Sequence, residues 1–478
     1  MSNHDPQPER DEALAAFREK LAKAAGVPAA ASASNRADEP AESVKLPPQP
    51  KTIEELGLSQ GLVTDLILRI LHYTGAPTAA QLVKRTALHV KIVQQTISTL
   101  RDERLIEVFG TSDLHSGNYR YRLTERGTER AKEALEQTKY GGPAPVTIEQ
   151  YRAVVSPLLA RSTRGDRLRL EAMLGELVLS PRVADAVARA LASGKTGIFY
   201  GPSGNGKSEI LQRFAQNLGG DMLVPHAIYA HGQVIRVFDP SAHERLRGAE
   251  AAGSKLSDEL ATDDRWVAIR RPAIVLGAEL GAQSLDLTYD PQARMYQAPP
   301  HIKAQGGALI VDDLGRQSVP AQELLTRWLI PLERKTDKLT FVTGETIAVP
   351  FHAALLFATN AQLSRLADES MRRRILYKVH IPAPTAAEFM ELLRLACRER
   401  RVTVAEGAVE HAVDRIYGSD DSAPRASHAR DLIDMLVEAA AFDGRTPVFE
   451  PRAFDLAHEL FFAPGPPSPE AALDDVLA

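Results

Sequence analysis

The sequence predicts an α/β fold in which helices flank a parallel sheet and smaller units adjoin it at both ends. Three observations support this prediction. A short apolar run, 197–200, leads through a glycine-rich loop into helical spacing from Ser208. A second apolar run, 308–311, ends in two acids, as a buried parallel strand does at its carboxyl edge. Residues 52–138 combine helix-like and strand-like runs in a separate small unit.

Composition narrows the class of protein. The chain has 478 residues, 44% of them hydrophobic, with a net charge of −5. This length suggests about two to four domains. Its one cysteine, Cys397, excludes an intramolecular disulfide and a cysteine-based zinc site, and the histidines lack the spacing of a zinc hydrolase. Because no apolar run is long enough for a membrane span and the N-terminus is polar, we expect a cytoplasmic protein without membrane insertion.

The spacing of apolar residues and the Pro- and Gly-rich boundaries divide the chain into six segments. They are a disordered N-terminal segment (1–50) in which 11–24 has the spacing of one short helix, a small folded unit (51–140), a linker or helical connector (141–169), an α/β core with hairpin insertions (170–382), a helical segment (383–445), and a C-terminal helix and tail (446–478).

The first folded segment has three helix-like runs, 61–73, 78–84 and 91–103, followed by two strand-like runs, 105–109 and 119–123. This order is typical of a winged helix-turn-helix, whose third helix enters the DNA major groove. The candidate DNA-facing residues are Lys91, Gln94, Gln95, Ser98, His115, Asn118 and Arg120. Residues 51–140 hold 13 Lys and Arg against 11 Asp and Glu, a thin excess for a DNA binder. Docking of a protein is therefore favoured, and duplex DNA stays an alternative.

The loop after the first core strand has the P-loop pattern. Its glycines let backbone N–H groups converge on a polyphosphate, and the following helix N-terminus adds positive potential. Lys207 is expected to reach the β- and γ-phosphates, and the Ser208 hydroxyl to bind Mg²⁺. The predicted ATP-binding residues are Gly201, Pro202, Ser203, Gly204, Asn205, Gly206, Lys207 and Ser208.

Two acids at the end of the second core strand complete the predicted nucleotide site. Asp312 is expected to hold Mg²⁺ together with Ser208. Asp313 is expected to orient the attacking water and help to deprotonate it.

A strand-rich stretch, 219–306, lies between the two halves of the site. Hairpin signals occur at His231–Gly232 and at Asp290–Pro291, and a further strand is predicted at 271–276. We interpret the stretch as an insertion that faces a substrate or a neighbouring subunit.

Residues 306–316 resemble the Walker B region of AAA+ ATPases, and the glycines at 306–307 resemble those of the hairpin-bearing bacterial branch. The apolar run 354–360 is similar to the sensor 1 strand, which implies that Asn360 positions water. The segment 368–378 resembles the one that carries the arginine finger, which implies a role for Arg373 and Arg374, with Arg372 third. The run 429–436 resembles the sensor 2 helix, with Arg430 at the γ-phosphate and Arg425 as the alternative.

This resemblance covers roughly 170–445 and implies that 170–382 is the nucleotide-binding core and that 383–445 is a helical lid. A narrower likeness is to a group of bacterial AAA+ proteins that carry an N-terminal winged helix. The resemblance implies Mg²⁺-dependent ATP hydrolysis by a homo-oligomeric ring, a hexamer, that needs an arginine from the neighbouring subunit. Most members have Glu where this chain has Asp313, whose shorter side chain leaves very slow hydrolysis as an alternative.

Three hypotheses for the function follow. The first is an ATPase that remodels an unknown protein partner recruited by the winged helix, with Tyr296–Lys303 and the His231–Gly232 hairpin facing the pore. The second is a DNA-directed ATPase or transcription-type regulator. The third is a nucleotide-gated scaffold with very slow hydrolysis.

Overall fold

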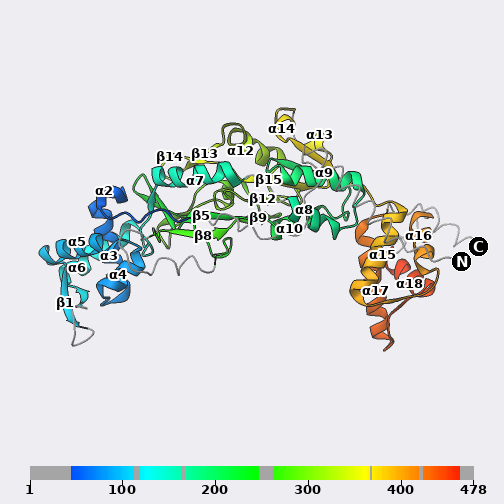
Figure 1. The fold of residues 1–478 in the computed structure, drawn as a ribbon, viewed down its shortest axis with the longest axis horizontal. Helices are drawn as coiled ribbons and strands as arrows, with labels where there is room; N and C mark the ends of the chain where they lie inside the picture. The colour runs from blue at the N-terminus through cyan, green and yellow to red at the C-terminus, as the bar shows by residue number, and fades with distance from the viewer. Residues whose placement is uncertain are drawn as a thin grey trace, which may run out of the picture.

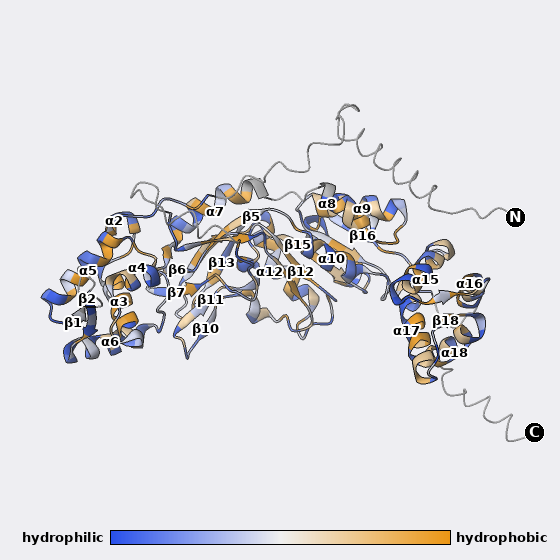
Figure 2. Ribbon diagram, turned by 60° about the horizontal axis from the view of Figure 1, so that its bottom comes forward, coloured by the Kyte–Doolittle hydropathy of each residue, from blue (hydrophilic) through white to orange (hydrophobic). Residues whose placement is uncertain are grey.

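The structure is a computed structural model that describes residues 45–111, 119–162, 167–246, 262–366, 369–418 and 424–462. The molecule is elongated (Figure 1). The N-terminal unit with the two-stranded wing (residues 53–137), called the winged unit below, lies at one end, the α/β core lies in the middle, and a helical unit (residues 386–461) lies at the other end. Hydrophobic residues concentrate in the central strands and on one side of the flanking helices (Figure 2). The predicted helix at 11–24, the wing residues His115 and Asn118, and the tail from residue 463 lie outside the described residues.

The N-terminal unit contains the three predicted helices and the two predicted strands in the predicted order, with one further helix before them and one after them. They are α2 (Ile53–Leu56), α3 (Gln60–Thr74), α4 (Ala79–Thr86), α5 (Val90–Asp102), β1 (Ile106–Thr111), β2 (Tyr119–Leu123) and α6 (Glu125–Gln137). Thr78 caps α4 through a capping box with Gln81, and the Thr124 side chain caps α6. The strands β1 and β2 pair antiparallel as a two-stranded wing.

The core is a five-stranded parallel sheet, which confirms the predicted fold class. Its strands are β4 (Gly197–Tyr200), β9 (Ala273–Leu276), β12 (Ala308–Val311), β15 (Ala354–Thr359) and β16 (Tyr377–His380), in the spatial order β16-β4-β15-β12-β9. All four pairings are parallel. Every residue of β12 and β15 is buried, as expected of strands covered on both faces.

Helices cover the two faces of this sheet. One face packs against α8 (Arg167–Gly175), α9 (Pro181–Ala192) and α10 (Lys207–Gln216). The other packs against α12 (Ala321–Arg334), α13 (Leu363–Leu366) and α14 (Glu369–Arg374). Ser180 is the N-cap residue of α9 and Pro181 is the first residue of the helix, although the Ser180 side chain makes no capping hydrogen bond.

The insertion forms a second five-stranded sheet, in the order β10-β11-β7-β6-β3. Its strands are β3 (Val146–Thr147), β6 (Ala227–Ala230), β7 (Gln233–Arg236), β10 (Thr288–Asp290) and β11 (Met295–Gln297). Two antiparallel pairs adjoin it, β5 (Asp221–Pro225) with β8 (Trp266–Arg270) and β13 (Thr336–Thr340) with β14 (Thr346–Pro350). The predicted hairpin at His231–Gly232 joins β6 and β7. The run 271–276, interpreted as part of the insertion, instead supplies the edge strand β9 of the core sheet.

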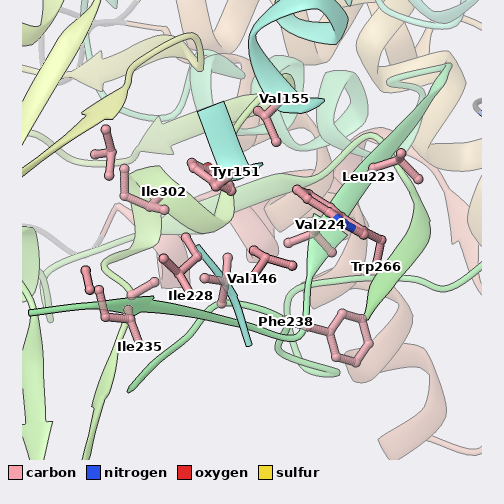
Figure 3. Packing of buried hydrophobic residues seen from close by; sticks show 14 of the residues in the cluster. Val146, Tyr151, Val155, Leu223, Val224, Ile228, Ile235, Phe238, Trp266 and Ile302 are labelled. Atoms are coloured by element: carbon pink, nitrogen blue, oxygen red, sulfur yellow. The ribbon is translucent and has the colours of Figure 1, made fainter. Parts of the chain in front are cut away.

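A large hydrophobic cluster lies beneath the insertion sheet (Figure 3). It joins the sheet to α7 (Ile148–Ser162), the short helix α11 (Pro300–Lys303) and the strand pair β5–β8. The 3-10 helix η1 (Ala282–Leu285) instead contributes Leu285 to the hydrophobic cluster of the core sheet. The exposed fractions of Tyr296 and Ile302 are both 2%, and that of His301 is 0%. The prediction that Tyr296–Lys303 faces a pore is therefore wrong for these side chains, because they fill the core beneath the insertion sheet. The tip residues His231 and Gly232 are exposed.

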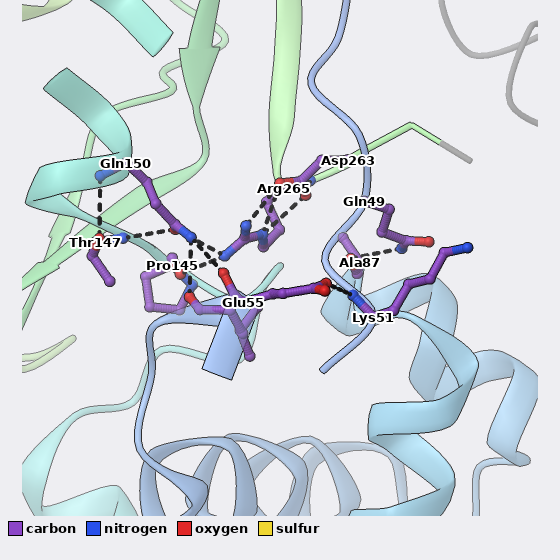
Figure 4. Close-up of polar contacts among 10 residues, drawn as sticks. Gln49, Lys51, Glu55, Ala87, Pro145, Thr147, Gln150, Asp263 and Arg265 are labelled. Atoms are coloured by element: carbon purple, nitrogen blue, oxygen red, sulfur yellow. Dashed lines mark hydrogen bonds and ion pairs between the residues drawn. The ribbon is translucent and has the colours of Figure 1, made fainter. Parts of the chain in front are cut away.

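The winged unit joins the rest of the chain through a polar junction (Figure 4). The Arg265 guanidinium forms a buried ion pair with Asp263, 2.7 Å between nitrogen and oxygen, and donates to the Pro145 carbonyl. The Gln150 amide donates to the backbone carbonyl of Glu55 at 3.0 Å. Ala227 and Val234 of the insertion sheet pack into the hydrophobic core of the winged unit. Shared core and shared hydrogen bonds fix the winged unit on the insertion sheet.

The C-terminal unit contains α15 (Ala386–Arg400), β17 (Thr403–Val404), α16 (Ala408–Gly418), α17 (Ala426–Phe442), β18 (Val448–Phe449) and α18 (Pro451–Phe461). Phe454 and Ala457 of α18 are buried in the same hydrophobic cluster as Phe389 of α15 and Leu432 of α17. The last helix, which sequence analysis set apart from the lid, therefore packs into it.

The junction generates a stability prediction. Replacing Arg265 by Met leaves the buried Asp263 carboxylate without its partner, so we expect the free energy of unfolding to fall by about 3–5 kcal/mol. Arg270→Met is the matched control, because the Arg270–Glu244 pair is exposed and should change stability by less than about 0.5 kcal/mol. Denaturant unfolding of the two variants measures the difference, and equal stability would contradict the role given to Arg265.

Candidate functional site

The glycine-rich loop connects the end of β4 to the start of α10. Gly201, Gly204 and Gly206 have φ angles of 142°, 79° and 83°, which residues with a Cβ rarely adopt. A Cβ on Gly201 would lie 2.1 Å from the Ile381 carbonyl oxygen. Glycine is thus required both by the backbone conformation and by the close approach of the chain after β16.

Lys207 is held inside this loop. Its exposed fraction is 5%, and its Nζ donates to the carbonyls of Gly201, at 3.0 Å, and Pro202, at 2.7 Å. Burial lowers the pKa of the ammonium, and the carboxylates of Asp313 and Asp312 partly offset that effect. The loop thereby keeps one positive charge at the position predicted to meet phosphates.

The end of β12 lies beside the start of α10. The Ser208 hydroxyl donates to Asp312 Oδ1 at 2.8 Å, which brings the two predicted Mg²⁺ ligands into contact. No group of three or more His, Cys, Asp or Glu side chains suited to a metal ion occurs among the described residues. A hydroxyl and one carboxylate fit Mg²⁺, which takes few protein ligands and completes its shell with water and phosphate oxygens.

Asp313 and Asn360 also lie together, at the ends of β12 and β15. The Asn360 amide donates to Asp313 Oδ1 at 3.0 Å. Asp313 has a φ of 49°, so the chain turns sharply directly after Asp312 and aims the two carboxylates differently. An acid whose oxygen is fixed by an amide is suited to orient a water molecule.

Sequence reasoning missed Gln317, which supports this turn. Its amide nitrogen donates to the carbonyls of Gly277 and Asp312, both at 3.2 Å, and its oxygen accepts from the Gly315 N–H at 2.8 Å. Gln317 is 9% exposed. No spacing in the sequence singles it out, because its partners lie directly after β9 and in the turn after β12.

The helical lid contacts the loop, and the two line an open pocket of about 470 Å³. The Ala426 N–H donates to Asn205 Oδ1 at 3.1 Å, and the Ser427 N–H donates to the Gly204 carbonyl at 2.8 Å. The pocket is lined by the loop residues Ser203–Ser208, the acid Asp313, the amide of Asn360, apolar residues such as Val178 and Leu392, and Arg430 of the lid. This volume and mixed lining suit a ligand of nucleotide size.

The predicted arginines occupy different positions. Arg430 lines the pocket with a side chain 63% exposed, beside Asp431, whereas Arg425 is the N-cap residue of α17. Arg373 and Arg374 lie on α14 and are not among the residues that line the pocket. Arg373 pairs with Glu369, and Arg374 donates to Glu333 of α12 at 2.9 Å. Arg372 is exposed at the same helix end.

Comparison with known proteins does not identify the family of the whole chain. Residues 385–460, which span the helical lid, match a family described as "Domain of unknown function (DUF8689)". None of the curated proteins matches the chain. Among the described residues, no helix combines the length and apolar character needed to cross a membrane.

Solved structures resemble the chain distantly. NtrX from Brucella abortus is 13% identical with a TM-score of 0.38, and the match covers 57% of this chain and 52% of NtrX. The RuvB Holliday junction branch migration motor of Thermotoga maritima is 13% identical with a TM-score of 0.35, covering 60% of this chain and 71% of RuvB. The chain thus spans about half of NtrX. Scores this low carry no function across, so the fold is assigned from the chain's own strand order and loop.

Proposed function

We propose that this protein is a Mg²⁺-dependent AAA+ ATPase that remodels a protein partner. One observation carries the proposal: Lys207, Ser208 and the Asp313–Asn360 pair line one pocket of about 470 Å³, and Asp312 is hydrogen-bonded to Ser208 directly behind it. These groups match, in order, the needs of phosphate binding, metal binding and orientation of water.

Each group has a defined task in this proposal. Backbone N–H groups of 201–206 and the Lys207 ammonium bind the phosphates of ATP. Ser208 and Asp312 would hold Mg²⁺, which would supply charge neutralisation on the β- and γ-phosphate oxygens. Asp313, fixed by Asn360, orients the attacking water and accepts its proton. Arg430 on the lid contributes positive charge at the pocket.

The position of the arginines of α14 is an argument that the chain assembles into a ring. They lie on the core outside their own pocket, so a role in catalysis requires a second subunit that receives them. Exposed apolar side chains flank them, Ile330 at 58% and Leu376 at 57% exposed. An apolar surface beside a cationic one fits contact with a neighbouring copy whose pocket carries phosphates. We propose a homo-oligomer, a hexamer by resemblance, in which Arg374 or Arg373 completes the neighbouring site.

The attachment of the winged unit to the insertion sheet is an argument that the protein acts mechanically on a partner. Because it shares its core with the insertion sheet, motion of that sheet moves the winged unit as well. A partner bound there would be displaced when the core changes its nucleotide state. The winged unit would therefore recruit the partner and also transmit force to it.

Duplex DNA is a second candidate for what the winged unit binds. Basic side chains are exposed on α4, α5 and β2, namely Lys84, Arg85, Lys91, Arg101, Arg120 and Arg122. Gln94, Gln95 and Ser98 are exposed on the face of α5 predicted to enter the major groove. Such a surface supplies phosphate contacts and side chains that can reach base edges.

The ATPase proposal predicts two distinct defects. Lys207→Ala should abolish measurable nucleotide binding, because it removes the charge that the loop holds for the phosphates. Asp313→Asn should bind ATP normally and lower kcat about 100-fold or more, because the amide cannot accept a proton. Steady-state phosphate release and calorimetric binding separate the two, with the exposed residue Gln216→Ala as control. Full turnover by Asp313→Asn would contradict its role and leave a gated scaffold as the better description.

The trans-arginine proposal predicts complementation. Arg374→Ala and Lys207→Ala should each be inactive alone, and mixing them should restore part of the ATPase rate. In mixed rings an intact Lys207 site receives Arg374 from a Lys207→Ala neighbour. Arg365→Ala, an exposed arginine of the neighbouring helix α13, serves as control and should keep the wild-type rate. No recovery on mixing, with both variants folded and assembled, would contradict an arginine acting between subunits.

The DNA alternative predicts salt-dependent duplex binding that Lys91→Glu weakens about tenfold, since the change replaces a phosphate-facing cation by an anion. Fluorescence anisotropy with the full chain at several salt concentrations measures this. Lys378→Glu, an exposed lysine on β16 far along the sequence from the winged unit, is the control. If the chain does not bind the duplex, or if Lys91→Glu leaves binding unchanged, the result favours the proposal that the winged unit binds a protein.

A further inference from the structure

Asn205 lies where the glycine-rich loop meets the lid. Its exposed fraction is 5%, and it lines both the large pocket and a smaller adjoining one. Asn205 Oδ1 accepts the N–H of Ala426, the first residue of α17, at 3.1 Å. The N-cap residue of α17, Arg425, makes no side-chain capping bond. Asn205 therefore supplies, from another part of the chain, the acceptor that a helix N-terminus normally finds in its own cap.

The other half of the same amide lacks a partner among the described residues. Asn205 Nδ2 is buried and makes no hydrogen bond to any residue that the structure describes. Its orientation is fixed, because the Ala426 N–H is a donor and must face the amide oxygen. A buried amide N–H₂ without an acceptor is unfavourable by about 1–3 kcal/mol, so an acceptor brought by a ligand would relieve that cost.

The surroundings of Nδ2 specify an anionic acceptor. Asn205 lies between Gly204 and Gly206, in the part of the loop where backbone N–H groups converge. The N-terminus of α17, a helix of 17 residues, adds positive potential at the same place. The Lys207 ammonium is bound to the same loop.

We propose that Asn205 is a positioning residue that joins the lid to the phosphates of the bound nucleotide. One amide makes both contacts: its oxygen holds the first turn of α17, and its nitrogen donates to a phosphate oxygen. The proposal rests on the proposed function, because the phosphate is that of the nucleotide.

The coupling follows from this geometry. A phosphate that fixes Asn205 also fixes the start of α17, and Arg430 lies one turn further along the same helix and lines the pocket. Because such coupling is reciprocal, nucleotide binding tightens the lid, and a tightened lid strengthens nucleotide binding. The Asn205 side chain thereby couples nucleotide binding in the loop to the position of the lid.

Two substitutions separate the two contacts. Asn205→Asp keeps an oxygen for the Ala426 N–H and replaces the donor by an anionic oxygen. Asn205→Ala removes both. Affinities for ADP and for a non-hydrolysable ATP analogue are measured by calorimetry on the full chain, and hydrogen exchange is followed in peptides that contain the start of α17. Gln216→Ala, which removes an exposed amide on α10, is the control, and thermal unfolding checks that each variant is folded.

We expect Asn205→Asp to weaken both nucleotides about tenfold or more, while exchange at the start of α17 without nucleotide stays as in the wild type. Asn205→Ala should weaken the nucleotides and also speed exchange there several-fold. The proposal is overturned if Asn205→Asp binds both nucleotides like the wild type, or if Asn205→Ala leaves that exchange unchanged. A wild type that binds neither nucleotide would refute the proposed function and the phosphate contact together, and the exchange difference of Asn205→Ala would then persist alone.

Discussion

The parallel register of the core sheet is the constraint on which the site depends. Val311 of β12 pairs with Phe357 of β15, and Thr359 of β15 pairs with Tyr200 of β4, so three strands end at one edge. The residues that follow these ends are the glycine-rich loop, Asp312 with Asp313, and Asn360. Because parallel strands all end at the same edge of a sheet, the residues that follow them lie close together even when they are far apart in the sequence. A slip in this register would separate the Ser208–Asp312 and Asp313–Asn360 pairs at once.

The second half of the pocket comes from a unit with its own core. The lid is held together by its own hydrophobic cluster, yet its helix α17 begins on the loop, through Asn205 and the Gly204 carbonyl. A Cβ on Gly204 would lie 2.7 Å from the Ser427 hydroxyl, so glycine at this position allows the close approach of the lid. Among the described residues two hydrogen bonds join the loop to the start of α17, so contacts made by a ligand would weigh heavily in the lid's position.

The elements that could be predicted from the sequence are those determined by the spacing of residues close together in the chain. The strand–loop–helix at 197–216, the acids after β12 and the capped helices of the winged unit each depend on neighbours a few residues away. Long-range packing decided what was missed. Gln317 bonds to the distant Gly277 carbonyl, the strand at 273–276 joins the core sheet, and Tyr296 is buried against Phe341. An aromatic residue beside a turn is apolar in either setting, so spacing alone could not tell a pore loop from a core.

The position of the winged unit bears on how the chain would use ATP. Recruitment modules on free linkers bind partners without transmitting force, because the linker absorbs the motion. Here the Lys139 N–H donates to the Ala293 carbonyl at 3.0 Å, Gln150 bonds back to Glu55, and the buried Arg265–Asp263 pair closes the junction. The insertion sheet lies between this unit and the core sheet along the molecule (Figure 2). A displacement that starts at the glycine-rich loop therefore has a continuous packed path to the winged unit. A rigid connection of this kind is better suited to moving a bound partner than to capturing it passively.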